Sequence, residues 1–314
     1  IKLIMIRRRF SSGESEFNPD RYLTIEALED GLQISHANGF EYKTDNNEWQ
    51  RAPQYELTTE INKGDFLYIR ANWTKSNSLP FNITRSCNLR GNCLSLLFGN
   101  NADKQYDISQ FPRAFSYLFS RCPIKEVVPG FLPATTLANY CYYQMFYDCT
   151  SLKSVTTGNG VTSIGKYAFY NCYKLVEVIN KSSLNITVGA EDNGWVACYA
   201  KEVHSGESKI VNYNDYLFYT YNGVNYLVGY AGTDTELTLP ESYNSEKYEI
   251  YKYAFYNRDD ITKVISGIKK ENNGRDIPED FIAKIANEYN LNESQINELE
   301  EAKAQTSGAV AVQF

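Results

Sequence analysis

Residues 132–155, LPATTLANYCYYQMFYDCTSLKSV, hold the pattern that decides the fold. A short apolar segment runs into an aromatic cluster, after which core-type residues follow at a spacing of three: Phe146, Cys149, Leu152 and Val155. The spacing returns twice, first at Phe169, Cys172, Leu175 and Val178, and then at Phe255, Arg258, Ile261 and Val264. Apolar residues at fixed offsets, repeated with a period of about 20 to 50 residues, are typical of stacked repeats. The sequence therefore predicts a solenoid.

The array is predicted to span residues 115–268. RAFSYLFSRC (113–122) places Phe119 and Cys122 in a first, degenerate repeat. Phe119 lies 27 residues before Phe146, Phe146 lies 23 before Phe169, but 86 residues separate Phe169 from Phe255. We therefore expect an insertion at about 180–240, which contains a β-hairpin because Asn222-Gly223 is a strong short-range hairpin signal.

The segment before the array has the pattern of short strands. Period-2 stretches such as YLTIEAL (22–28) and FLYIRANW (66–73) alternate with turn sequences, which is typical of a small β-sandwich. We predict a sandwich at residues 22–86, after a polar arm at 1–21. The apolar run NLRGNCLSLLFGN (88–100) lies in a bridge, residues 87–114, expected to cap the first open edge of the array.

The C-terminal segment, residues 275–314, shows helical spacing. Pro278 suits a first helical turn, and apolar residues recur along PEDFIAKIANEYNLNESQINELEEAKAQ (278–305). Two interpretations stay open for this helix: a cap of the array, or a partner-binding element. The last residues, SGAVAVQF, pair as an edge strand or fray.

Composition excludes several classes of protein. The net charge of −7 argues against a nucleic-acid groove, which needs a basic stripe, and no apolar run reaches the length of a membrane span. The N-terminus, IKLIMIRRRF, has no apolar region typical of a secretory signal; Met5 is a candidate initiator, with residues 1–4 then preceding the native start. The 26 tyrosines suit half-exposed sheets, stacked repeats and binding surfaces.

No pattern in the chain indicates catalysis. The two histidines, His36 and His204, lie in different predicted domains and in no recognisable catalytic motif. The seven cysteines show no C-x-x-C pair, although Cys87 and Cys93 are candidates for a disulfide. Nucleotide-binding glycine motifs are absent from the sequence. We therefore expect no catalytic residue, no metal and no cofactor.

The repeats resemble the BspA-type leucine-rich repeats of gut Bacteroidetes. The resemblance is carried by LPATTLANYCYYQMFYDCTSL, by GVTSIGKYAFYNCYKL (160–175) and, more loosely, by YEIYKYAFYNRDDI (248–261). YNGVNYLVGYAGTDTELTLPE (221–241) is similar to the island that often interrupts such arrays, and the 22–86 block resembles the immunoglobulin-like domain that precedes some of them. The resemblance covers about residues 22–267. It implies a mainly β protein with a minor α part.

The resemblance also implies a function. The expected role is that of a non-enzymatic adhesion protein that binds a protein or glycan at a bacterial surface or outside the cell. The alternative is a virion component (fibre, decoration or tail protein) of a phage that infects such bacteria; a glycan-active enzyme is the third class. The chain is compatible with a homo-oligomer or with assembly into a larger particle.

The expected partner contacts are the tyrosines beside the repeat core, Tyr142, Tyr143 and Tyr170, although packing inside the repeats is the competing interpretation. The expected buried repeat core consists of Phe119, Cys122, Phe146, Cys149, Leu152, Val155, Phe169, Cys172, Leu175, Val178, Phe255, Ile261 and Val264.

Overall fold

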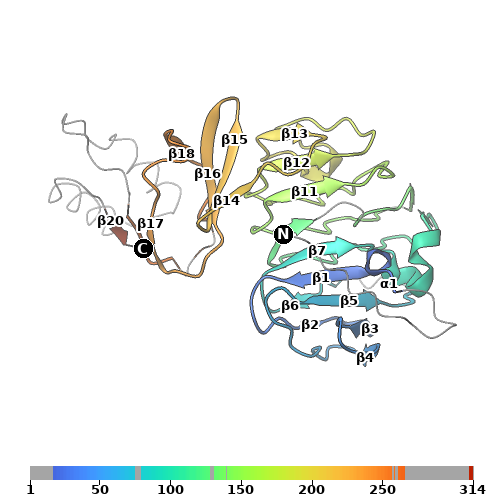
Figure 1. Ribbon diagram of the computed structural model, residues 1–314. Coiled ribbons are helices and arrows are strands. Elements are labelled where there is room, and N and C mark those ends of the chain that lie inside the picture. Colours follow the sequence, from blue (N-terminus) through green and yellow to red (C-terminus); the bar gives the residue numbers. More distant parts are fainter. Residues whose placement is uncertain are drawn as a thin grey trace, which may run out of the picture.

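The computed structural model describes residues 17–74, 79–127, 131–138, 140–256, 258, 261–265 and 311–313 (Figure 1). This part of the chain is mainly β. Its strands are β1 (Leu23–Ala27), β2 (Ile34–Ser35), β3 (Phe40–Lys43), β4 (Gln50–Ala52), β5 (Phe66–Arg70), β6 (Asn82–Ile83), β7 (Cys87–Gly91), β8 (Asp107–Ile108), β9 (Ile124–Val127), β10 (Thr136–Leu137), β11 (Ser154–Thr157), β12 (Glu177–Asn180), β13 (Glu202–His204), β14 (Val211–Tyr213), β15 (Tyr216–Tyr221), β16 (Val224–Tyr230), β17 (Glu236–Thr238), β18 (Tyr248–Ile250), β19 (Lys263–Ile265) and β20 (Ala311–Gln313). The described helices are short: α1 (Ser95–Phe98) and the 3-10 helices η1 (Pro19–Arg21), η2 (Gly99–Lys104) and η3 (Asn193–Trp195).

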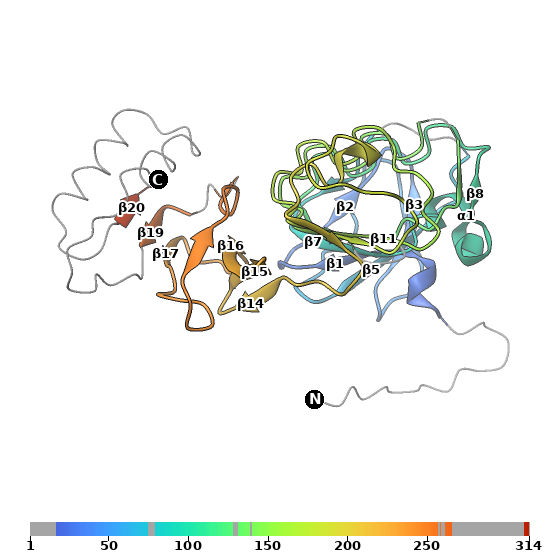
Figure 2. The same ribbon diagram turned by 90° about the horizontal axis from the view of Figure 1, so that it is seen from above.

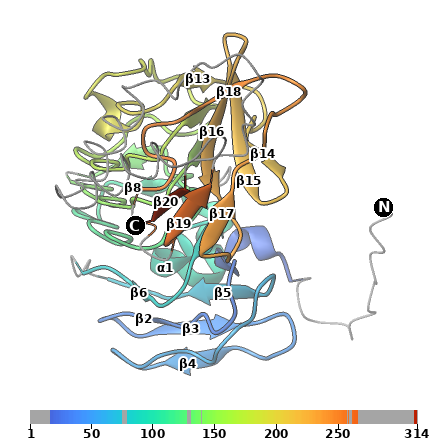
Figure 3. The same ribbon diagram turned by 90° about the vertical axis from the view of Figure 1, so that its left-hand side faces the viewer.

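A nine-stranded sheet joins the N-terminal block to the repeats, in the order β13-β12-β11-β9-β7-β1-β5-β3-β4. Strand β7 is the junction, because it pairs antiparallel with β1 and parallel with β9. Figure 3 shows the strands rising from β4 at one end to β13 at the other. The two predicted parts therefore share one sheet, and β7 of the predicted bridge lies near its centre.

The core is shared in the same way. One cluster of buried side chains runs from Leu23 in β1 to Ala200 in the repeats. Apart from the nine-stranded sheet, the described residues of the N-terminal block form a two-stranded pair, β2 with β6, and an isolated bridge between Leu32 and Ile61. The immunoglobulin-like assignment stays a prediction.

Each coil of the array contributes one parallel strand and one turn segment. Val127, Val155, Val178 and Val203 face one another in register across β9, β11, β12 and β13. Figure 2 shows the turn segments on the side opposite these strands. Between the two sides, the rings of Phe81, Phe119, Phe146 and Phe169 stack, with successive centroids 5.6, 5.7 and 5.0 Å apart. This is the stacked-coil arrangement that the repeat spacing predicts.

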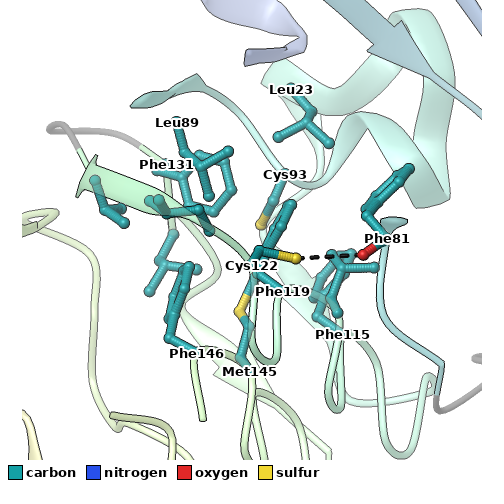
Figure 4. Packing of buried hydrophobic residues seen from close by; sticks show 14 of the residues in the cluster. Leu23, Phe81, Leu89, Cys93, Phe115, Phe119, Cys122, Phe131, Met145 and Phe146 are labelled. Carbon is teal, nitrogen blue, oxygen red and sulfur yellow. Dashed lines mark hydrogen bonds between the residues drawn. The ribbon is translucent and has the colours of Figure 1, made fainter. Parts of the chain in front are cut away.

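The repeat cysteines bind the backbone of the preceding layer. The thiol of Cys149 donates to the Phe119 carbonyl oxygen (3.0 Å), and that of Cys172 to Phe146 (3.2 Å). Cys122 donates to Phe81 at 3.3 Å, which extends the series into the N-terminal block (Figure 4). Burial raises the pKa of the Cys122 thiol to about 12. All seven cysteines are unpaired, so Cys87 and Cys93 form no disulfide.

The side chains expected in the repeat core are buried, except for half-buried Val264. The last three of them, however, lie outside the array. Phe255 and Ile261 belong to a second core cluster, and β19 pairs with β17 and β20, whereas β13 has its only described partner in β12. The repeat at 251–264 therefore follows the sequence pattern without extending the nine-stranded sheet.

The predicted insertion needs a correction at its start. Residues 193–204 form a further coil of the array, since β13 pairs with β12 and the Phe169 amide donates to the Gly194 carbonyl oxygen (2.8 Å). Its buried positions hold Val196, Ala197 and Ala200 in place of Phe and Cys, which hides the repeat in the sequence.

The hairpin of the insertion is confirmed. Strands β15 and β16 pair around Asn222 and Gly223, whose φ angles of 49° and 77° fit the expected tight turn. The arm at 1–16 and the predicted helix at 278–305 lie outside the described residues. At the C-terminal end, β20 pairs antiparallel with β19, which is the edge-strand option for SGAVAVQF, so these three residues are a strand and not part of the predicted helical segment.

Candidate functional site

The turn segments of the array form its second surface, which we call the turn face: residues 113–121, 140–149, 165–173 and 193–199. Many non-glycine residues here have positive φ, among them Tyr117 (62°), Tyr140 (62°) and Tyr167 (57°). This conformation is uncommon for such residues. Hydrogen bonds between coils hold it in place; for example, the Tyr117 amide donates to the Tyr143 carbonyl oxygen (3.0 Å).

Aromatic rings run along the turn face in one connected chain. Each ring meets the next edge to face, with centroid distances from 4.7 to 6.3 Å. We call this set the aromatic ladder, and it consists of Tyr117, Tyr140, Tyr143, Tyr167, Tyr170 and Trp195. Tyr140 is 61% exposed and the other five are half-buried. Because each ring is packed against another, the ladder offers aromatic surface in a fixed arrangement.

Exposed cations lie over rings on the same face. The Arg113 guanidinium carbon is 5.4 Å from the Tyr140 centroid, and the Lys166 ammonium is 4.8 Å from that of Tyr167. Contacts of this kind are favourable because the ring face carries negative charge. The aromatic ladder thus has cations beside Tyr140 and Tyr167, while the exposed carboxylates of Glu191 and Asp192 lie near Trp195 at its end.

Two of the three tyrosines expected to contact a partner belong to the ladder: Tyr143 and Tyr170. The prediction for Tyr142 is corrected, because its ring is 2% exposed and stacks on Phe115 at 5.8 Å inside the core. The sequence does not separate Tyr142 from Tyr143, since both belong to the same aromatic run.

Four members of the ladder were not predicted from the sequence: Tyr117, Tyr140, Tyr167 and Trp195. Tyr117 and Tyr167 each lie two residues before a repeat Phe (Phe119 and Phe169), so their shared offset was an available signal, whereas Tyr140 has no such counterpart. Trp195 belongs to the coil at 193–204, which has no Phe to mark it.

The opposite surface, the outer face of the nine-stranded sheet, carries a row of polar residues. Pairing places the members in one register line across β1, β7, β9, β11, β12 and β13: Glu26, Asn88, Glu126, Ser154, Glu177 and Glu202. Neighbouring strands lie about 4.8 Å apart, so these side chains are close neighbours.

Two of these carboxylates bind residues of the segment that follows β13, which lies against the sheet. Glu177 is fully buried; it accepts hydrogen bonds from the Ser208 hydroxyl and the Lys209 amide (3.0 Å). Glu202 accepts bonds from the Lys209 ammonium (2.7 Å) and the Tyr219 hydroxyl (2.7 Å). This end of the row therefore has a structural role.

The middle of the row is less well paired. Burial raises the pKa of the Glu126 carboxyl; Arg90 opposes this, while Glu26 and Glu177 add to it. The Ser154 hydroxyl is buried and has no hydrogen-bond partner. Buried polar atoms without partners destabilise a fold, so this stretch of the sheet is not optimised for stability.

Both histidines have structural contacts. The ring of His36 is buried against Trp73 and Phe81, its Nε2 donates to the Leu79 carbonyl oxygen (2.9 Å), and burial lowers its pKa. His204 Nε2 donates to Glu177 (3.2 Å), since its Nδ1 accepts from the Gly206 amide.

The described residues contain no group of three or more His, Cys, Asp or Glu side chains suited to a metal ion. Within the same ranges, no helix is long and apolar enough to cross a membrane.

Comparison with known proteins identifies the class of the repeats. Residues 115–221 match the family model of the BspA type leucine rich repeat region, in six copies. The predicted resemblance is thus confirmed for the array, and the matched range includes the coil at 193–204. No curated protein and no solved structure matches the chain. The N-terminal immunoglobulin-like domain and the bacterial group stay predictions.

Proposed function

We propose that the protein is a non-enzymatic binding protein, and that its aromatic ladder is the surface that holds the partner. BspA-type repeats suggest a protein-binding or adhesion-type role, and such repeats are typically found at the surface or outside the cell. The observation that carries the proposal is the ladder itself: six connected rings on the outside of a repeat array.

A pre-packed aromatic surface lowers the free-energy cost of binding a partner. Ordering side chains at an interface opposes association, and rings that are already packed against one another lose little freedom when a partner arrives. Tyrosine and tryptophan also combine apolar area with a hydrogen-bonding group, which suits protein and glycan surfaces alike.

Charge narrows the kind of partner. Arg113 is exposed beside Tyr140, so acidic groups on a partner are attracted to this part of the ladder. We place this role at a bacterial surface; a virion component that binds its host or other virion proteins is the alternative, and it uses the same surface.

The test is a capture assay with a ladder variant. The purified chain is immobilised and probed with mucin, with extracellular-matrix glycoproteins and with intact bacterial cells. In the ladder variant, Tyr140→Ser, Tyr143→Ser and Tyr170→Ser are combined. The matched control changes three exposed tyrosines elsewhere, Tyr55→Ser, Tyr106→Ser and Tyr213→Ser.

We expect at least a tenfold loss of capture in the ladder variant, with little change in the control. The melting temperature of each variant shows that it is folded. Equal capture by the wild type and the ladder variant would contradict the proposal and would direct attention to the sheet face or the N-terminal block.

A further inference from the structure

A hollow of about 470 Å³ lies at the end of the aromatic ladder. Its lining includes Tyr167 and Trp195 of the ladder together with Lys166, Glu191, Asp192 and Asn193. The volume falls within the range of about 300–1,000 Å³ that is usual for small-molecule sites. The hollow therefore has room for a short oligosaccharide or a few side chains.

The backbone under the hollow is tightly constrained. Gly194 has a φ of 68°, and a Cβ atom there would lie 2.4 Å from the Gly165 carbonyl oxygen of the preceding coil. Asn193 and Trp195 on either side also have positive φ, at 44° and 69°. Three consecutive residues in this region are unusual, and such strained positions concentrate at functional sites.

The hollow is lined by hydrogen-bond acceptors and by a hydrogen-bond donor, with charges of both signs. The carboxylates of Glu191 and Asp192 are exposed and form no hydrogen bond or ion pair with the described residues. The side-chain amide of Asn193 donates to the Asn185 carbonyl oxygen (2.9 Å), which leaves its own oxygen as an acceptor. Lys166 adds an ammonium group with three N–H donors.

Because the hollow carries charges of both signs, a ligand of either charge meets some repulsion in it. Lys166 repels a cation and offsets the attraction of the carboxylates for it. Two carboxylates, in turn, repel an anion. A neutral ligand rich in hydroxyl groups suits both, because a hydroxyl donates to a carboxylate and accepts from an ammonium. The C–H face of a sugar ring also packs on an aromatic ring, as apolar surfaces do.

We propose that the hollow binds a neutral carbohydrate, with Trp195 and Tyr167 as the apolar wall and with Glu191, Asp192 and Lys166 as hydroxyl partners. This inference deepens the proposed function, on which it rests, because it names the ligand class for one end of the aromatic ladder. A glycan attached to a larger partner would then occupy the hollow, while the rest of the ladder contacts the partner beside it.

The test uses saturation-transfer NMR on the full chain. The neutral probes are lactose, maltotriose, cellotriose, mannotriose and chitotriose; sialyllactose is the anionic comparison and lysine methyl ester the cationic one. The variants are Trp195→Ala, Asp192→Asn and Glu191→Gln. The control is Tyr55→Ser, at a 70% exposed position outside both the hollow and the aromatic ladder.

At least one neutral probe should receive saturation, and Trp195→Ala should abolish it. Asp192→Asn should weaken binding at least fivefold, and Tyr55→Ser less than twofold. If Trp195→Ala does not fold, the two carboxylate variants decide the question, since both positions are exposed. No transfer to any neutral probe, transfer to a charged probe alone, or transfer unchanged in the carboxylate variants would overturn the inference.

The two proposals fail separately. If the ladder variant loses partner capture but the wild-type chain binds no sugar, only the carbohydrate site is contradicted. Sugar binding with unchanged capture leaves the hollow in place and contradicts the ladder.

Discussion

At the scale of single residues, the phenylalanine stack joins successive coils through direct ring contacts. Phe146 is fully buried, with its centroid 5.7 Å from that of Phe119 and 5.0 Å from that of Phe169. Replacing it by alanine removes both contacts and leaves a cavity.

Phe146→Ala is expected to lower the free energy of unfolding by about 3–5 kcal/mol. Urea unfolding monitored by circular dichroism measures this change, with Tyr55→Ala, at a 70% exposed position, as the control. A loss below about 1 kcal/mol in Phe146→Ala would show that the register of the stack is misassigned.

The pKa of Glu126 gives a pH-dependent prediction. Burial raises this pKa above the ordinary value of a glutamate in the folded chain, so ionisation of the Glu126 carboxyl is harder in the folded than in the unfolded state. The destabilisation is absent below the unfolded pKa and develops as the pH rises through the folded pKa.

Glu126→Gln is therefore expected to stabilise the chain at pH 7 and to have less effect near pH 4. Unfolding midpoints in urea at the two values measure the difference. Glu249→Gln, at an exposed position, is the control for removal of one negative charge. A variant less stable than the wild type at pH 7 would argue against this account of Glu126.

The sequence predicted part of which side chains are buried and which are exposed. The spacing of three identified the buried Phe, Cys, Leu and Val positions, because burial follows the repeat. The same spacing did not show that Tyr142 is buried and Tyr143 half-buried, since both are tyrosines and the turn segment, with positive φ at Tyr142, follows no regular strand or helix period.

At the scale of elements, the close approach of successive turn segments limits which residues fit between them. A Cβ atom on Gly165 would lie 2.4 Å from the Cys141 carbonyl oxygen and 2.7 Å from that of Tyr142. Both neighbours are backbone atoms, which cannot move aside without displacing the coil.

Gly165→Ala is expected to destabilise the array by about 1–3 kcal/mol, the usual effect of overpacking. Gly158→Ala is the matched control, because its Cβ would make an ordinary contact of 3.7 Å with the Leu132 carbonyl oxygen. Thermal unfolding of both variants measures the difference. Equal melting temperatures would mean that the coils are farther apart than described.

Elements were predictable wherever their signal is local. The Asn222-Gly223 turn marks the β15–β16 hairpin by residue type alone. The coil at 193–204 escaped detection because Val196, Ala197 and Ala200 replace the large core residues, and its strand is defined only by pairing with β12.

At the scale of the whole molecule, β7 makes the N-terminal block and the array one structural unit. Leu89 in β7 is fully buried and pairs with Ile25 on one side and Val127 on the other. No local pattern predicts this junction, because it depends on a parallel pairing between segments on either side of α1.

The shared sheet predicts shared unfolding. Hydrogen exchange in increasing urea should give the same midpoint for peptides from β1 and from β11. Leu89→Ala should lower both midpoints together, by about 2–5 kcal/mol in unfolding free energy. Two separate midpoints, with β11 unaffected by the substitution, would indicate independent domains.

The central claim is that a partner is held on the turn face by the aromatic ladder. Hydroxyl-radical labelling of the tyrosines, with and without a captured partner, tests it most directly. We predict that Tyr140, Tyr143 and Tyr170 lose reactivity in the complex, while Tyr55, Tyr106 and Tyr213 keep theirs. Protection of the second set, with the ladder still labelled, would contradict the claim.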